Sequence, residues 1–210
     1  MSILTEVKEA TLAGDQGRVS ALTKQAIDEG IEADRIIQEG LIAAMVVVGK
    51  EFGEGKIYIP EMLIAARAMK SGLEVVKPFL VGGKIKSIAK VVLGTVKGDL
   101  HDIGKNLVAM MLEGFGVEVI DLGVDVSPEK FVEALKTHQP QFVGMSALLT
   151  TTMTSMEVTI KALEESGLRQ NVKVLVGGAP VTQAFADEIG ADGFGSSASE
   201  AMDLIKEALG

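Results

Sequence analysis

The most polar stretch in the second half of the sequence surrounds one of only two histidines, in the segment Gly98-Asp99-Leu100-His101-Asp102-Ile103-Gly104-Lys105-Asn106. A carboxylate two residues before an imidazole can accept a hydrogen bond from one ring nitrogen and so fix the tautomer. The other ring nitrogen then offers its lone pair to a metal. Asp99 is therefore a candidate orienting residue, and His101 is a candidate metal ligand.

The composition argues against a metal ion that is held by protein groups alone. The chain has no cysteine, so it can form neither a zinc–thiolate nor an iron–sulfur site, and no second histidine completes a site around His101. A macrocycle that brings its own four equatorial nitrogens needs only one axial ligand from the protein. The segment therefore fits a metal inside a macrocycle, while a solvated loop histidine remains the alternative.

Charge and hydropathy restrict the class of partner. The net charge is -9 and the pI is near 4.8, which argues against nucleic acid and anionic membranes, because both require clustered Lys and Arg. The most apolar run, residues 41–49, is far shorter than the roughly 20 residues of a membrane-spanning helix. Charged residues within 1–10 interrupt any signal peptide. We expect a cytoplasmic protein whose partners are small molecules and other proteins.

The first part of the chain has the hydrophobic period of helices. Apolar residues recur at three- and four-residue intervals up to residue 80, and Pro60 suits the first turn of a helix. The predicted helices cover residues 3–13, 17–29, 32–52 and 59–80. We expect residues 1–87 to form a four-helix bundle cap domain that ends in a linker at 81–87.

The rest of the chain, residues 88–210, alternates short β-branched runs with helical stretches. The predicted strands cover residues 90–96, 117–121, 141–146, 173–177 and 193–195. The predicted helices cover residues 104–114, 127–137, 152–167, 182–189 and 198–209, with Ser127-Pro128 as an N-terminal cap. This order predicts an α/β domain with a flavodoxin-like (Rossmann-type) five-stranded parallel sheet.

Such a sheet also predicts where a ligand binds. The chain reverses direction between the first and third strands, and ligands bind outside the carboxyl ends of the strands at that point. The loops after Val96 and Ser146 should therefore carry the site, with the loop after Gly177 beside them. Asp121 and Asp125, which flank the end of the second strand, are interpreted as ordinary loop residues.

Three sequence elements on these loops form a recognisable signature. Asp99-x-His101-x-x-Gly104, followed by Ser146-x-Leu148 and Gly177-Gly178, resembles the signature of cobalamin-binding domains that bind the cofactor "base-off, His-on". This family includes methionine synthase, the corrinoid proteins of methanol, methylamine and methoxy-aromatic methyltransferase systems, and certain adenosylcobalamin mutases.

The resemblance implies a role for each matching position. His101 would be the lower axial ligand of cobalt, Asp99 would accept its hydrogen bond, and Ser146 would supply a hydroxyl that extends this chain. Gly104 would allow the start of the next helix to approach the corrin. Thr150 to Thr152 would combine contact with the nucleotide tail and helix capping. The further cofactor contacts that we expect are Gly98, Asp102, Ile103, Leu148, Thr150, Gly177, Gly178 and Ala198.

The helical half carries a second resemblance. The segment Phe52-Gly53-Glu54-Gly55-Lys56-Ile57-Tyr58-Ile59-Pro60-Glu61-Met62-Leu63 looks like part of the four-helix cap of methionine synthase and the small corrinoid proteins. In that family the cap shields the upper face of the corrin, where the methyl group sits. Tyr58 is therefore a candidate cap residue over the cobalt, while an ordinary bundle core is the alternative for the Met and aliphatic residues nearby.

The resemblance implies a corrinoid carrier that uses cobalamin, as methylcobalamin and cob(I)alamin. It would shuttle a methyl group from a substrate-specific methyltransferase to an acceptor methyltransferase that uses tetrahydrofolate or a thiol, with a reductive activator as a further partner. It would be a component of a methyltransferase and not a complete enzyme. The alternatives are the small subunit of an adenosylcobalamin-dependent mutase, a cobalamin-dependent regulator, and a corrin-free flavodoxin-like module. The sequence does not specify the methyl donor.

Overall fold

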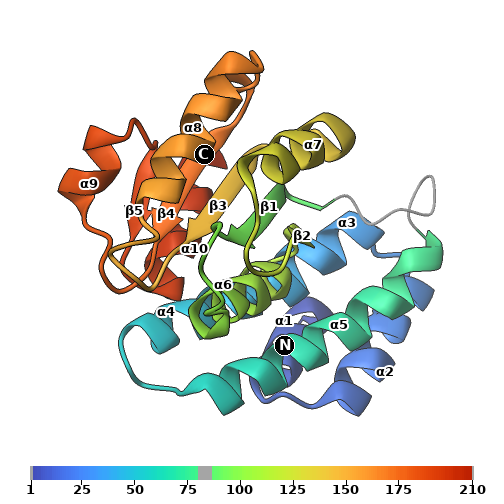
Figure 1. The fold of residues 1–210 in the computed structure, drawn as a ribbon. Coiled ribbons are helices and arrows are strands. Elements are labelled where there is room, and N and C mark those ends of the chain that lie inside the picture. The colour runs from blue at the N-terminus through green and yellow to red at the C-terminus, as the bar shows by residue number, and fades with distance from the viewer. Residues whose placement is uncertain (1, 80–86, 210) are drawn as a thin grey trace. The chain divides into compact units, whose positions relative to one another are not determined.

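The computed structural model describes residues 2–79 and 87–209 and divides the chain into two compact units (Figure 1). We call Met1–Ser87 with Glu113–Gly116 the helical unit, and Ile88–Leu112 with Val117–Gly210 the sheet unit. Residues 81–86 of the predicted linker lie outside the described residues. No helix in the two described ranges is long and apolar enough to cross a lipid bilayer.

The helical unit begins with two capped helices. In α1 (Ile3–Leu12) the hydroxyl of Ser2 accepts the backbone N–H of Thr5, and in α2 (Gln16–Asp28) the carboxylate of Asp15 accepts that of Arg18. Each cap satisfies an N–H group that would otherwise have no partner in the first turn. α5 (Ile59–Val76) packs against α2 and is followed by a short 3₁₀ turn, Lys77–Phe79. The predicted end of this helix at residue 80 lies outside the described residues.

The prediction of one continuous helix over residues 32–52 is wrong in its middle. The segment contains α3 (Ala33–Arg35), a π-helical segment η1 (Ile36–Ile42) and α4 (Ala43–Gly53). Gly40 lies against α1, where an added Cβ would come within 2.9 Å of Val7 Cγ1. In a π-helical turn the backbone hydrogen bonds join residues five apart instead of four. The four buried residues of this segment are Ile36, Ile37, Gly40 and Leu41.

The sheet unit has the predicted parallel sheet. Its strands pair in the order β2-β1-β3-β4-β5, with every pairing parallel. Their bounds are β1 Lys90–Thr95, β2 Glu118–Asp121, β3 Phe142–Ser146, β4 Lys173–Gly177 and β5 Gly193–Gly195. This order confirms the flavodoxin-like prediction, with the reversal of direction between β1 and β3.

Helices cover both faces of this sheet (Figure 1). They are α6 Ile103–Gly114, α7 Pro128–His138, α8 Thr154–Glu165, α9 Gln183–Glu188 and α10 Ala198–Leu209, with a 3₁₀ turn at Arg169–Asn171. Alternate residues of a strand point to opposite faces. Val92, Val143 and Val174 therefore join one core cluster, with Phe131 of α7 and Ile160 of α8. The strand residues that alternate with these, such as Val91 and Leu93, point to the other face, which α6 and α10 cover.

The structure departs from the sequence prediction at the N-terminal ends of α7 and α8. Ser127 occupies the cap position of α7 in an extended conformation, but its side chain makes no capping hydrogen bond to the backbone. Its carbonyl oxygen instead accepts the N–H groups of Lys130 and Phe131. α8 starts at Thr154 and not at Thr152. Thr152 has another partner, which is described below.

Candidate functional site

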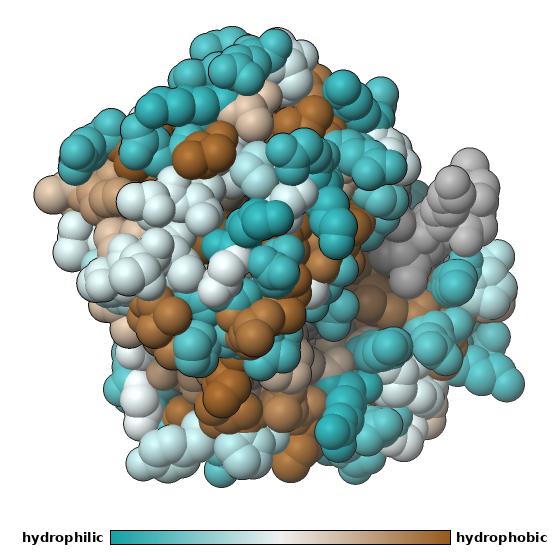
Figure 2. Space-filling model, viewed as in Figure 1, coloured by the Kyte–Doolittle hydropathy of each residue, from teal (hydrophilic) through white to brown (hydrophobic). Residues whose placement is uncertain are grey.

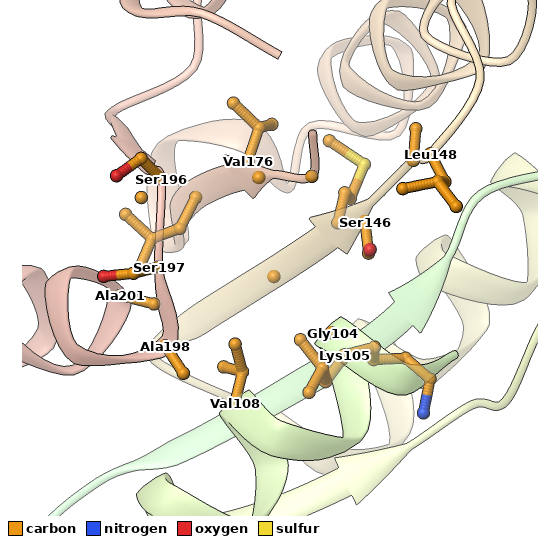
Figure 3. Close-up of a pocket in the computed structure, with 18 of the residues that line it drawn as sticks. Gly104, Lys105, Val108, Ser146, Leu148, Val176, Ser196, Ser197, Ala198 and Ala201 are labelled. Atoms are coloured by element: carbon orange, nitrogen blue, oxygen red, sulfur yellow. The ribbon is translucent and has the colours of Figure 1, made fainter. Parts of the chain in front are cut away.

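A cavity of about 560 Å³ lies within the sheet unit. β1, β3 and β4 contribute one wall, and α6 and α10 contribute the other, so that the cavity extends along the sheet from the carboxyl-end loops to Val91, Leu112 and Ile205. Figure 3 shows Ser146 at the end of β3, Val108 on α6, and Ser197 and Ala198 at the start of α10 around this space. The cavity therefore lies at the position that the sheet topology predicts for a ligand.

Most of the residues nominated from the sequence line this cavity. They are His101, Asp102, Ile103, Gly104, Ser146, Leu148, Gly177, Gly178 and Ala198. Gly98, Asp99 and Thr150 are not part of its wall. Tyr58 belongs to the helical unit, where it precedes α5 and is largely exposed. Its predicted place over the cobalt stays a prediction.

The expected pair of carboxylate and imidazole is present. Asp99 Oδ1 lies 2.8 Å from His101 Nδ1, and the same oxygen accepts the backbone N–H of His101 at 3.0 Å. The hydroxyl of the fully buried Thr95 donates to the carbonyl oxygen of His101 at 2.9 Å. Within the described residues, Nε2 of this half-exposed ring has no hydrogen-bond partner. A proton on Nδ1 that faces the carboxylate leaves the Nε2 lone pair available to a ligand.

The carboxylate of Asp99 is buried and strongly bonded. Its Oδ2 accepts the hydroxyl of Thr152 at 2.6 Å and the backbone N–H groups of Leu148 at 2.8 Å and Leu149 at 3.3 Å. Burial alone would raise the pKa of Asp99, but the hydrogen bonds from Thr152, the backbone and His101 outweigh it and hold the pKa well below its ordinary value. Asp99 is therefore an anion that faces the imidazole.

The hydroxyl that extends this hydrogen-bond chain belongs to Thr152, and its assignment to Ser146 is corrected. Thr152 is brought back to Asp99 by a turn in which its backbone N–H donates to Leu149 O. Ser146 ends β3, six residues earlier, and its hydroxyl lies beside the cavity (Figure 3). A threonine at the first residue of a predicted helix was the available sequence signal, but it also fits simple helix capping.

Glycines shape the cavity for two different reasons. An added Cβ at Gly178, where φ is +123°, would fall 1.9 Å from Ala147 O, and one at Gly177 would fall 2.7 Å from Gly195 O. Both residues therefore let neighbouring backbones approach closely. An added Cβ at Gly104 would meet nothing within 4 Å. The protein's own packing gives no reason for a glycine at this position of the cavity wall, whereas a close ligand would.

The surface around His101 is unusually apolar. Leu100 and Ile103, on either side of the histidine in sequence, are 71% and 79% exposed, and Leu148 is also exposed. On the face seen in Figure 2, apolar side chains near the start of α6 stand among hydrophilic ones. An exposed apolar patch beside a polar group is typical of a ligand surface. A flat macrocycle with an axial nitrogen ligand fits these residues.

An ion pair between a buried lysine and a partly exposed carboxylate lies next to the same loop. The Nζ of Lys105, which is almost completely buried, lies 2.5 Å from Asp121 Oδ2 and 2.7 Å from Asn106 Oδ1. Figure 3 shows the nitrogen of Lys105 directed away from the other labelled residues of the cavity. Asp121 is therefore not the ordinary loop residue that the sequence predicts. Through its bond to Lys105 it connects β2 to the start of α6.

The described residues contain no group of three or more His, Cys, Asp or Glu that could hold a metal ion. A metal at His101 would therefore need ligands from outside the protein, such as the four nitrogens of a corrin. On the protein side, the described residues offer one imidazole nitrogen without a hydrogen-bond partner, exposed apolar side chains and an adjoining cavity.

Comparison with protein families agrees with this geometry. A B12 binding domain model matches residues 89–203, and a second B12 binding domain model matches residues 3–77. The chain therefore belongs to the B12-binding family, and the prediction of a cobalamin-binding protein is confirmed. The alternative of a corrin-free flavodoxin-like module no longer holds.

Similar proteins define the class within this family. The chain is 42% identical to a corrinoid protein of Desulfitobacterium hafniense strain Y51, over 100% of this chain and 99% of the relative. It is 44% identical to the trimethylamine corrinoid protein of Methanosarcina barkeri, over 99% and 96%. The methanol:cobalamin methyltransferase complex MtaBC from Methanosarcina barkeri matches with a TM-score of 0.86 and 30% identity, over 99% of this chain and 79% of that chain. The chain is thus a corrinoid protein of the methyltransferase-system class.

Proposed function

We propose that this protein is the methyl-carrying corrinoid component of a three-component methyltransferase system and that it binds cobalamin base-off, with His101 as the lower axial ligand. The observation that carries the proposal is the Asp99–His101 pair on the cavity wall, with Nδ1 bonded to a buried carboxylate and Nε2 free of protein partners in the described residues. The domain assignment that we propose is a cap over residues 1–87 and a cobalamin-binding domain over residues 88–210.

The bound cobalamin would supply a cobalt centre that accepts and releases a methyl group. Asp99 would keep the Nδ1 proton in place, and its negative charge would increase electron donation from the ring to the metal. Thr152 and the Leu148 amide would hold the carboxylate in this position. The apolar side chains of Leu100 and Ile103 would lie under the macrocycle and exclude water from the axial bond.

The cavity is the proposed position of the displaced nucleotide tail. Its wall is mainly aliphatic, and Ser146 and Ser197 add hydroxyl groups. The start of α10 is fixed by two hydrogen bonds, because the N–H of Glu200 donates to the hydroxyl of Ser197, and the carboxylate of Glu200 accepts the N–H of Ser196. This part of the wall is therefore preorganised for a ligand.

The partners are inferred from the relatives. Trimethylamine and dimethylamine corrinoid proteins are 42–44% identical over nearly the whole chain, and the MtaBC structure is a complex with a methanol methyltransferase. We propose a methylated amine or methanol as the methyl source, brought by a substrate-specific methyltransferase. We further propose an acceptor methyltransferase that uses tetrahydrofolate or a thiol, a reductive activator, and action in the cytoplasm. The relatives favour this reading over a mutase subunit.

Reconstitution tests the proposal directly. The apoprotein is mixed with hydroxocobalamin, free cofactor is removed by gel filtration, and the visible spectrum and stoichiometry are recorded for the wild type, His101→Ala and His138→Ala. We expect about one cobalamin per chain in the wild type and in His138→Ala, and a changed spectrum or lost cofactor in His101→Ala alone. A wild type that retains no cofactor, or a His101→Ala spectrum identical to the wild type, would refute the proposal.

A further inference from the structure

Asp125 has an unusual backbone conformation. Its φ is +51°, and among the described residues only Gln139 shares a positive φ without being glycine. The left-handed region is unfavourable for a residue with a Cβ, although Asp tolerates it better than most, and such strain persists only where the surroundings enforce it. The contacts around Asp125, which follows β2, must therefore enforce this conformation.

Two hydrogen bonds join Asp125 to the loop after β1. Its Oδ1 accepts the backbone N–H of Gly98 at 2.8 Å, and its own N–H donates to Asp99 O at 3.0 Å. Gly98 also has a positive φ, +85°. Asp125 thus holds two peptide units shortly before His101, the Lys97–Gly98 unit with its side chain and the Asp99–Leu100 unit with its backbone.

Other contacts of this loop involve different groups. The N–H of Asp99 donates to Val96 O at 3.1 Å within the loop itself. The carbonyl of Lys97 accepts the hydroxyl of Ser155, and the carbonyl of His101 accepts that of Thr95. The Ser155 contact holds the carbonyl end of the Lys97–Gly98 peptide unit, whose N–H is the one that Asp125 accepts, and the Thr95 contact holds the carbonyl of the metal-ligand candidate itself. Only Asp125 supplies a side-chain acceptor for the Gly98 N–H among the described residues.

We propose that Asp125 is a positioning residue for the axial ligand: through the backbone of Gly98 and Asp99 it sets the direction of the Asp99 carboxylate and hence the tautomer and orientation of the His101 ring. The inference rests on the proposed function, because a fixed Nε2 direction matters only if that nitrogen binds a ligand. It assigns a task to a residue that touches neither the imidazole nor the cavity wall.

Substitution by glycine separates positioning from stability. Asp125→Gly removes the carboxylate but tolerates the positive φ, so the fold should not suffer from strain. Asp125→Asn keeps an amide oxygen as acceptor and also tolerates this conformation. Gln139→Gly is the matched control, because it makes the same kind of change at the other strained position, where the structure gives no side-chain contact to the His101 loop.

Two measurements on the apoprotein are independent of the cofactor. In Asp125→Gly we expect the Gly98 amide to exchange its hydrogen about tenfold faster, and the nitrogen NMR signals of His101 to show a mixture of tautomers. We expect the wild type, Asp125→Asn and Gln139→Gly to show slow exchange and a single Nδ1-protonated tautomer. Thermal midpoints of all three variants should stay within about 3 °C of the wild type.

The third measurement uses hydroxocobalamin. We expect the Kd of Asp125→Gly to be roughly fivefold higher than that of the wild type, with a less shifted visible spectrum, because only the fraction of molecules with the correct tautomer and ring orientation binds the cofactor. Asp125→Asn and Gln139→Gly should bind like the wild type.

An Asp125→Gly protein with wild-type tautomer, exchange and Kd would overturn the proposal, and so would a lower thermal midpoint with an unchanged tautomer. A wild type that binds no cobalamin would refute the proposed function instead, and the tautomer and exchange data would still decide the role of Asp125.

Discussion

In the helical unit the ion pairs lie at the surface, whereas the sheet unit buries charged groups beside its cavity. Arg35 and Glu39 are 2.7 Å apart with both side chains more than half exposed, and Lys56 and Glu54 form a similar surface pair. Asp99 and Lys105 of the sheet unit are almost completely inaccessible to solvent. The same residue types therefore have different physical consequences in the two units.

The difference indicates where the chain tolerates unfavourable burial. A buried charge is costly unless hydrogen bonds compensate for it, while an exposed pair contributes little. In the helical unit the buried polar side chains within the described residues are two threonines, Thr11 and Thr23, and Thr23 has no hydrogen-bond partner. In the sheet unit, four buried polar side chains lie near the carboxyl ends of the strands, and they are Thr95, Asp99, Lys105 and Thr152. Their location matches the candidate site.

The largest effect should come from glycine in the sheet unit. Gly178→Ala places a Cβ 1.9 Å from Ala147 O at a φ of +123°, so backbone must move. We expect a loss of roughly 4 kcal/mol or complete failure to fold. Gly55→Ala in the helical unit also has a positive φ, but its Cβ would meet nothing within 4 Å, and we expect a loss of about 1 kcal/mol. Urea unfolding followed by circular dichroism measures both losses. Equal losses for Gly178→Ala and Gly55→Ala would contradict the expected contrast between the two units.

Asp99→Asn should have the next largest effect. Both carboxylate oxygens of Asp99 accept hydrogen bonds. In asparagine an NH₂ group replaces one of these oxygens, and at either position it would face N–H or O–H donors instead of an acceptor. We expect the free energy of unfolding to fall by about 3 kcal/mol. Glu39→Gln, the matched change in a surface ion pair, should leave the unfolding midpoint unchanged.

The same carboxylate predicts a pH dependence. The pKa of Asp99 in the folded protein lies below its unfolded value of 3.8, so its stabilising contribution is complete above that value and is lost as the pH falls. The difference in unfolding free energy between the wild type and Asp99→Asn should therefore be constant from pH 7 to about 5 and shrink below about 4. A difference that grows in acid would show that the folded carboxyl takes up a proton more readily than the unfolded one.

The sequence was sufficient for the sheet because β1, β3 and β4 are compact, mostly apolar runs that alternate with helical segments. The predicted strands 173–177 and 193–195 agree with β4 and β5 at both ends, and the predicted helix 198–209 agrees with α10. The helical half was harder, because a π-helical segment does not disturb the apolar period enough to be recognised. Gly40 of this segment packs closely against Val7, a tertiary contact that the apolar period does not reveal.

Within the candidate site, local pairs could be predicted and distant partners could not. Asp99 and His101 are two residues apart, so their hydrogen bond follows from spacing alone. Thr152 is 53 residues from Asp99, and Asp125 is 27 residues from Gly98. The backbone conformation of the loops after β2 and β3 decides which hydroxyl or carboxylate reaches the loop after β1. The residue pattern alone does not reveal that conformation.

Lys105→Met should have a moderate effect. Methionine keeps the aliphatic stem of the buried side chain but removes the ammonium that bonds Asp121 and Asn106. Asp121 is partly exposed and can be solvated by water, so we expect a loss of only about 1–2 kcal/mol. Lys56→Met in the helical unit should leave the thermal midpoint unchanged. Calorimetric scans of both variants measure this, and a Lys105→Met protein as stable as the wild type would mean that the Lys105–Asp121 pair has no net stabilising effect.

The smallest effect on stability should accompany a clear effect on binding. Gly104 and Gly17 are each the second residue of a helix, α6 and α2, and neither has a positive φ. An added Cβ would meet nothing within 4 Å at Gly104 and only a side-chain oxygen at 3.7 Å at Gly17. Alanine should therefore stabilise each helix by about 0.5 kcal/mol, because it restricts the unfolded chain.

Only Gly104→Ala should weaken the binding of hydroxocobalamin, by about tenfold or more, because Gly104 lies in the cavity wall, where a macrocycle must approach the backbone closely. Gly17→Ala should bind like the wild type. Equal affinity of both variants, measured by titration in the visible range, would mean that the ligand does not approach the start of α6, and the contrast between a functional and a purely structural helix start would disappear.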